Sequence, residues 1–121
     1  RTAAAFRFSA DLGRLVETVV HNHLIRDSQK RLFYFQGKRE CDFLVWRDDK
    51  PQTAIQVCYD PTDRLPKREL AGLQEAMSAL DLCEGTLITH GRSETLGVGR
   101  RKIELVPLWQ WLVRVAEAEV D

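Results

Sequence analysis

The fold is decided by two segments, ECDFLV at residues 40–45 and AIQVCY at residues 54–59, in which polar side chains alternate with apolar ones. Alternation with a period of two predicts a strand, because successive side chains of a strand point to opposite faces of the sheet. If the two strands pair as a hairpin, Asp42, Gln56 and Cys58 converge on one surface. We therefore expect any chemistry of this chain to lie on that surface.

The same alternation assigns the other side chains of the two strands to faces. Asp42 is expected to share a face with Glu40 and Leu44. The opposite face of that strand then holds Cys41, Phe43 and Val45. In the second strand the expected core side holds Ile55, Val57 and Tyr59. A polar turn at residues 47–51 is expected to connect the two strands.

Length and composition indicate one globular domain. The chain has 121 residues, of which 44% are hydrophobic and 30% charged. It carries 18 basic and 18 acidic residues, so any basic footprint for nucleic acid must be local. No apolar run approaches the ~20 residues that cross a bilayer, so we expect no membrane partner. Three cysteines without a CxxC spacing read as reduced thiols, which favours a cytoplasmic location.

The remaining sequence predicts an α/β domain with a mixed sheet flanked by helices. After a lead-in over residues 1–8, Ser9 or Asp11 is expected to cap a helix that runs to about Arg26. Strands are expected over residues 31–36, 40–46, 54–59, 85–90 and 102–106, and further helices over 63–80 and from Pro107 onward. Residues 91–101 read as a loop. The predicted order is α-β-β-β-α-β-β-α.

This order resembles the restriction-endonuclease-like PD-(D/E)XK core, and four motifs make the resemblance more specific. LGRLVETVVHNHL at residues 12–24 resembles the GxLxExxVxxxL helix of a nuclease-like domain that follows the AAA module in a large family of prokaryotic ATPases. GKRECDF at residues 37–43 looks like that family's GKEVDF. IQVCY at residues 55–59 is similar to its IEVK strand, and VPLWQWL at residues 106–112 to its closing IPLWxWL.

The resemblance implies one domain over residues 1–121, the C-terminal part of a longer cytoplasmic ATPase whose ATPase domain would be its partner. A nuclease of this fold holds Mg²⁺ with two carboxylates from adjacent strands and keeps a lysine nearby. Residue by residue, Asp42 matches the first carboxylate and Glu17 the helix acid that can join such sites. Gln56 stands where the second carboxylate is expected, and Cys58 stands where the lysine is expected.

Each of these residues also has a purely structural interpretation. Glu17 could be a solvated helix acid in contact with His21 one turn later. Asp42 could be a surface strand residue paired with a lysine or arginine, and Gln56 an ordinary polar strand residue. Cys58 reads as a small buried apolar side chain, because no base adjoins it in the sequence.

Outside these positions the sequence offers fewer candidates. A dense basic patch consists of Arg92, Arg100, Arg101 and Lys102, which could contact nucleic acid or form a solvated loop. His21 and His23 lie two apart on a helix and point away from each other, so they do not predict a metal site. Trp109 and Trp111 predict one core tryptophan and one on a flank, where it could contact the ATPase domain.

Three functions remain open from sequence. The first, which we favour, is a catalytically degenerate nuclease-like module that needs no cofactor and acts in interaction or regulation, with nucleic acid contacted through Arg100, Arg101 and Lys102. The second is a divergent Mg²⁺-dependent nuclease that uses Glu17 and Asp42 as metal ligands, with Lys38 or Arg39 in place of the missing lysine. The third is a scaffold for dimerisation.

Overall fold

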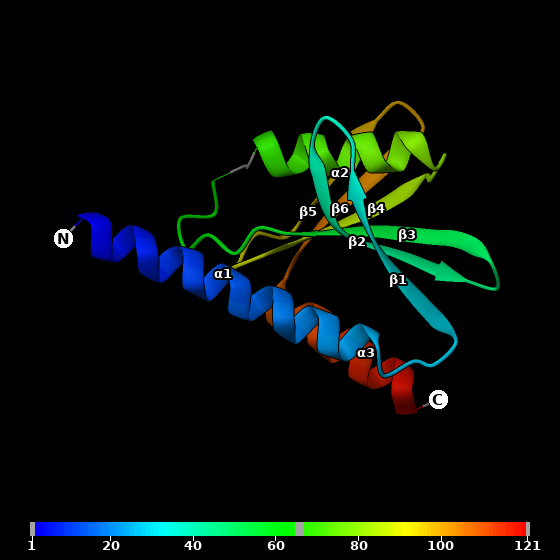
Figure 1. The fold of residues 1–121 in the computed structure, drawn as a ribbon, viewed down its shortest axis with the longest axis horizontal. Coiled ribbons are helices and arrows are strands. Elements are labelled where there is room, and N and C mark those ends of the chain that lie inside the picture. Colours follow the sequence, from blue (N-terminus) through cyan, green and yellow to red (C-terminus); the bar gives the residue numbers. More distant parts are fainter. Residues whose placement is uncertain (1, 65–66, 121) are drawn as a thin grey trace.

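The chain folds into three helices and a sheet of six strands in the part that the structure describes (Figure 1). The structure is a computed structural model that describes residues 2–64 and 67–120, with side chains placed for residues 11–64, 67–97 and 99–118. Its elements are α1 (Thr2–Leu24), β1 (Lys30–Gln36), β2 (Glu40–Arg47), β3 (Lys50–Val57), α2 (Lys67–Ala79), β4 (Glu84–Thr89), β5 (Glu94–Val98), β6 (Arg101–Pro107) and α3 (Leu108–Val120).

The sheet is mixed, as the sequence predicts. Its strands lie in the order β1-β2-β3-β4-β6-β5. The first three strands form an antiparallel meander, β3, β4 and β6 run parallel, and β5 pairs antiparallel with β6 at the far edge. Helix α2 connects the parallel strands β3 and β4, as a parallel pair requires a crossover connection.

Two apolar layers hold the helices on opposite faces of the sheet. On one face Val16, Val20 and Leu24 of α1 and Trp111 of α3 pack on β2, β3, β4 and β6. On the other face Leu73, Ala76 and Met77 of α2 pack on the same strands. Figure 1 shows α1 and α3 running side by side below the sheet and α2 lying above it. No helix in the described part of the chain is long and apolar enough to span a membrane.

Aspartates close two of the turns because they tolerate the left-handed backbone conformation. Asp48 and Asp49, with φ of 53° and 62°, form the two-residue turn between β2 and β3, where both central residues need positive φ. Asp81, with φ of 52°, follows the end of α2. There Leu82 N donates to Met77 O at 2.8 Å and Asp81 N to Ser78 O at 3.3 Å, the pattern of a Schellman cap.

The helix starts differ from the sequence expectation. Helix α1 already begins at Thr2, so Ser9 and Asp11 lie inside it and do not cap it, and residues 2–8 are helical instead of a lead-in. The three alanines at residues 3–5 are strong helix formers, which favours this extension. Helix α2 begins at Lys67 and not at Asp63, whose φ of 52° is not helical. Residues 65 and 66 of the predicted helix lie outside the described residues.

The predicted loop over residues 91–101 contains the strand β5, so the observed order is α-β-β-β-α-β-β-β-α. Strand β5 lies at the edge of the sheet and pairs only with β6. An edge strand needs few apolar residues, so its sequence gives a weak strand pattern. Glu94 and Gly97 weaken the pattern of β5 further. The sheet therefore has one strand more than predicted, and it is still a mixed sheet.

Gly72 is a close contact between α2 and the sheet, and its replacement tests this packing. A Cβ at residue 72 would collide with the carbonyl oxygen of Glu40 and lie 3.2 Å from Gln56 Nε2. We expect Gly72→Ala to lower the free energy of unfolding by roughly 2 kcal/mol, because a backbone carbonyl cannot move aside. The measurement is urea unfolding followed by circular dichroism.

The matched control is Gly13→Ala, in the middle of α1, where an added Cβ meets nothing within 4 Å. This variant should be as stable as the parent chain or more stable by up to about 1 kcal/mol, because alanine favours the helix. Equal stability of the two variants would contradict the close packing of α2 on β2.

Candidate functional site

A β-bulge in β2 decides where Asp42 points. Phe33 of β1 pairs with Leu44 and Phe35 pairs with Cys41, so Asp42 and Phe43 together stand opposite the single residue Tyr34. The extra residue interrupts the alternation of the strand. Phe43 and Val45 accordingly pack under α1 and α3, whereas Cys41 and Leu44 pack under α2.

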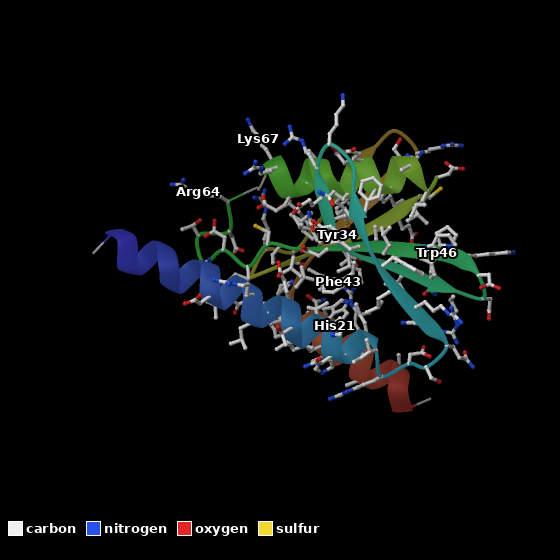
Figure 2. The ribbon with its side chains drawn as sticks, viewed as in Figure 1. His21, Tyr34, Phe43, Trp46, Arg64 and Lys67 are labelled. Atoms are coloured by element: carbon white, nitrogen blue, oxygen red, sulfur yellow. The ribbon has the colours of Figure 1, made fainter. Side chains whose placement is uncertain are left out.

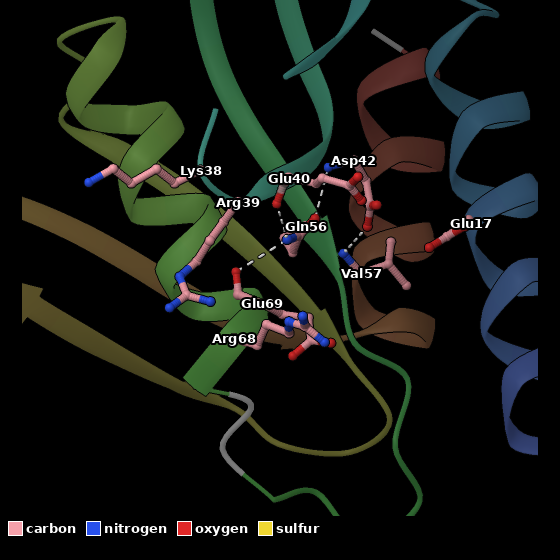
Figure 3. A pocket seen from close by; sticks show the side chains of 9 residues that line it. All are labelled: Glu17, Lys38, Arg39, Glu40, Asp42, Gln56, Val57, Arg68 and Glu69. Atoms are coloured by element: carbon pink, nitrogen blue, oxygen red, sulfur yellow. Dashed lines mark hydrogen bonds between the residues drawn. The ribbon is translucent and has the colours of Figure 1, made fainter. Parts of the chain in front are cut away.

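The bulge overturns the predicted grouping of side chains. In β3 the alternation is regular: Ile55 and Val57 lie in the α1 and α3 layer, and Ala54 lies in the α2 layer. Gln56 points toward α2, where its amide reaches the carbonyl of Glu69. Asp42 lies on the side of Glu17 of α1 (Figure 3). The prediction that Asp42, Gln56 and Cys58 share one face is therefore wrong.

Asp42 and Gln56 nevertheless meet, because they bridge β2 and β3 where the strands separate. The backbone register of the two strands ends at the pair Phe43 and Ile55. Beyond it, Asp42 N donates to Gln56 Oε1 at 2.8 Å and Val57 N donates to Asp42 Oδ2 at 2.9 Å. We call Asp42 and Gln56 the side-chain clasp. It replaces the backbone hydrogen bonds that the diverging strands no longer make.

The amide of Gln56 is fully engaged. Besides accepting from Asp42 N, it donates from Nε2 to Glu40 O at 2.9 Å and to Glu69 O at 3.2 Å, so it also ties β2 to the start of α2 (Figure 3). The residue is only 4% exposed. A buried amide whose oxygen and nitrogen are both bound to the backbone acts as a structural link.

A cavity of about 490 Å³ opens beside the clasp. Its lining is strongly charged and includes one apolar side chain, Val57. The lining residues are Glu17, Lys38, Arg39, Glu40, Asp42, Gln56, Val57, Arg68 and Glu69. The structure thus brings together Glu17, Asp42 and Gln56 of the predicted site and adds charged residues from the β1–β2 turn and from α2 (Figure 3).

The two acids that face each other in this cavity resist ionisation. Burial raises the pKa of Asp42 to about 6; the hydrogen bond from Val57 N opposes this rise, and repulsion from Glu17 adds to it. Burial also raises the pKa of Glu17, against the attraction of Arg14. Among the placed side chains, His21 contacts Asn22 and the ring of Phe43 instead of Glu17. Glu17 is therefore a half-buried acid of the cavity.

Cys58 does not belong to the lining of the cavity. It packs against the apolar layer under α2, and burial raises the pKa of its thiol to about 12. A thiol with this pKa is protonated at neutral pH and is a poor nucleophile and metal ligand. This supports the interpretation of Cys58 as an apolar filler.

The predicted metal site does not fit these residues. Of the expected chemical set, one acid is replaced by Gln56, whose neutral amide oxygen is a weaker ligand for Mg²⁺ than a carboxylate, and the lysine is replaced by a protonated thiol. Asp42 and Glu17 remain, and Asp42 Oδ2 already accepts from Val57 N. Among the side chains that the structure places, no group of three or more His, Cys, Asp or Glu could hold a metal ion.

Three of the four residues of the predicted basic patch make structural contacts. Arg101 Nη1 donates to Leu82 O at 2.6 Å and to Met77 O at 3.3 Å, so it completes the C-terminal cap of α2. Arg100 and Arg101 both pair with Asp81, at 3.4 Å and 3.2 Å. Arg92 pairs with Glu94 at 2.8 Å. Lys102 is the member of the patch without an ion pair among the placed side chains, so the patch presents less free positive charge than its sequence indicates.

The tryptophans follow the prediction from their spacing. Trp111 is 7% exposed and belongs to the core under the sheet, whereas Trp109 is 64% exposed on the outer side of α3. The sequence did not single out Arg68, Glu69 or Glu75, which complete the surroundings of the cavity from α2. The sequence of a helix does not indicate which of its charged residues will contact a turn that is distant in the chain.

Comparison with known proteins identifies a relative of uncharacterized function and no family. No known family profile matches the chain. The protein named "Uncharacterized protein MJ1544" from Methanocaldococcus jannaschii is 33% identical over 114 residues, a match that covers 86% of this chain and 25% of that protein. The chain thus spans about a quarter of the length of the relative that it matches.

Proposed function

We propose that this chain is a catalytically degenerate nuclease-like module of the PD-(D/E)XK type that acts as an interaction or regulatory domain in a longer ATPase. The observation that carries the proposal is the engagement of Gln56. Its amide binds Asp42 N, Glu40 O and Glu69 O, so the position of the second catalytic acid has become a structural link. The protonated thiol of Cys58 in the position of the lysine supports the same proposal.

Other features support the family assignment and the larger protein. The mixed sheet, with the antiparallel meander followed by parallel strands and with α1 beside the β2–β3 hairpin, is compatible with the PD-(D/E)XK core. The match to a quarter of a longer protein is compatible with a domain of a multidomain chain. The exposed Trp109 on α3 would suit a contact with the ATPase domain.

A divergent Mg²⁺-dependent nuclease is the alternative, and one observation favours it. Glu17 and Asp42 line the same cavity as Lys38 and Arg39, so two carboxylates and two cations surround one space. In that case the raised pKa of Asp42 would fall when a cation binds, because the cation stabilises the carboxylate. Degeneracy remains our proposal because Gln56 supplies no carboxylate and Cys58 supplies no cation.

A cleavage assay distinguishes the two functions. The chain and its Asp42→Ala variant are incubated with fluorogenic DNA and RNA in the presence of Mg²⁺ or Mn²⁺. We expect no cleavage above the background of the variant, because Gln56 and the protonated thiol of Cys58 stand where the second acid and the lysine of an active nuclease are expected. Cleavage by the parent chain that is lost in Asp42→Ala would overturn the proposal and establish the nuclease.

A further inference from the structure

Four exposed basic side chains gather beside the cavity from two distant parts of the sequence. Lys38 and Arg39 lie in the turn between β1 and β2, and Lys67 and Arg68 begin α2. Figure 1 shows this turn lying beside α2, and Figure 2 places Lys67 at the start of the helix. Lys38, Arg39 and Arg68 line the cavity. We call these four residues the basic rim.

Glu75 of α2 builds the rim by holding the turn against the helix. Its Oε1 accepts from Lys38 N at 2.8 Å and its Oε2 accepts from Arg39 N at 3.0 Å. Gly37 lies so close to the carboxylate that an added Cβ would collide with it. The carboxylate thus binds the backbone of the turn, and the ammonium and guanidinium groups of Lys38 and Arg39 have no ion pair among the side chains that the structure places.

The rim differs from the other clusters of positive charge in this chain. Arg100 and Arg101 pair with Asp81, and Arg114 pairs with Glu104 at 2.8 Å. No rim side chain makes an ion pair with any carboxylate that the structure places. The N-terminal end of α2 adds the partial positive charge of unpaired backbone N–H groups. The rim thus places unneutralised basic side chains at the edge of a cavity that is also lined by the acids Glu17, Glu40, Asp42 and Glu69.

The surroundings of the rim indicate the chemistry of its partner. A protein partner would need an apolar centre to its contact, but the cavity lining includes Val57 as its single apolar side chain. Of the large exposed apolar side chains, Tyr34 of β1 borders the cavity through a hydrogen bond with Glu40, and none of the others lines it. Glu40 and Glu69 line the cavity inside the rim and would repel an anion that entered, so phosphates would be held along the outer edge.

We propose that the basic rim binds the phosphate backbone of nucleic acid without reading its sequence, and that Glu75 is a positioning residue for this surface. The inference rests on the proposed function in one respect: it names the interaction that a module without catalysis would supply. It moves the expected nucleic-acid contact from Arg100, Arg101 and Lys102 to the start of α2 and the β1–β2 turn that lies beside this helix. Binding of this kind depends on charge and falls as salt rises.

The test is fluorescence anisotropy of labelled DNA and RNA of mixed sequence, single-stranded and duplex, without divalent cations. Two rim variants, Lys38→Glu/Arg39→Glu and Lys67→Glu/Arg68→Glu, are compared with Arg100→Glu/Lys102→Glu, which changes the net charge equally. We expect each rim variant to bind at least about tenfold more weakly and to lower the salt slope by about 2, with the control within about threefold of the parent chain. Circular dichroism verifies that each variant is folded.

Three results would overturn the assignment. The parent chain could fail to bind any of the nucleic acids, the control could lose as much affinity as the rim variants, or polyglutamate could compete as well as nucleic acid does. Each result leaves the proposed lack of catalysis intact, because cleavage is measured separately with metal present. Cleavage in that separate assay would overturn the proposed function but would not test whether the rim binds nucleic acid.

Glu75→Gln tests the positioning role by a change of sign. The substitution removes a negative charge near the rim, so charge alone would strengthen binding. An amide offers one acceptor oxygen instead of two, so the turn would lose the hydrogen bond from Lys38 N or Arg39 N. We expect weaker binding, by about threefold or more, from a loosened turn. Stronger binding would exclude Glu75 as a positioning residue.

Discussion

Gln56→Glu, which restores the acid expected of an active nuclease, is expected to destabilise the chain by roughly 3 kcal/mol or more at pH 7. A carboxylate keeps the hydrogen bond from Asp42 N but turns an oxygen toward Glu40 O and Glu69 O, where Gln56 now donates. It also adds a buried negative charge beside Asp42. The loss of two hydrogen bonds and the unpaired charge act in the same direction.

The effect should depend on pH in a defined direction. The unfavourable surroundings would raise the pKa of the new carboxyl above its unfolded value, and a protonated carboxyl can donate one hydrogen bond. The stability of the variant relative to the parent chain is therefore lost as pH rises. Urea unfolding at about pH 5 and pH 7.5 measures this difference.

Gln52→Glu is the matched control, because Gln52 lies on the same strand β3 and its side chain is exposed. It should change the free energy of unfolding by less than about 0.5 kcal/mol. If Gln56→Glu were as stable as this control, the amide would not be a structural link. The main support for a degenerate site would then disappear.

The alternation of β3 was readable from sequence, whereas that of β2 was not. Ile55 and Val57 lie on the predicted core side because β3 is regular. In β2 the bulge places Asp42 and Phe43 opposite Tyr34 and reverses the faces on either side of it. A bulge depends on how two strands pair, and the sequence of one strand does not carry that information.

The candidate site was found in part, because some of its residues belong to recognisable motifs whereas Arg68, Glu69 and Glu75 of α2 do not. Glu17, Asp42 and Gln56 were identified by position in motifs, and the structure gathers them at one cavity. Arg101 was misjudged for a related reason. Its neighbours in sequence indicate a basic patch, but its contacts with Met77 O and Leu82 O come from a helix end about 20 residues away.

Asp42→Asn is the second large effect, and it is expected to stabilise the chain at neutral pH. The pKa of Asp42 is about 6 in the folded chain against 3.8 as its ordinary value, mainly because of burial. The folded state therefore binds the proton more tightly than the unfolded state does. Stability is highest below about pH 4, is lost as pH rises to about 6, and is constant above that with respect to this group.

An asparagine at this position removes the ionisation and keeps an acceptor oxygen for Val57 N. We expect Asp42→Asn to be more stable than the parent chain by about 1–2 kcal/mol at pH 7.5, a figure reduced because Asp42 is partly exposed, and equally stable at about pH 4. Urea unfolding at the two pH values measures both differences. The control is Glu84→Gln, an exposed acid at the start of β4, which should change stability little at either pH.

The free energy of unfolding of the parent chain should fall relative to that of Asp42→Asn between pH 4 and pH 6. If it does not, the result contradicts the burial of this carboxyl. If the expected difference is found, the chain retains an acid that lowers its own stability at neutral pH. Such an acid is more characteristic of a binding site than of a packing position, because stability alone would favour asparagine. Adding Mg²⁺ then separates the two proposed functions: stabilisation of the parent chain, but not of Asp42→Asn, would favour the nuclease.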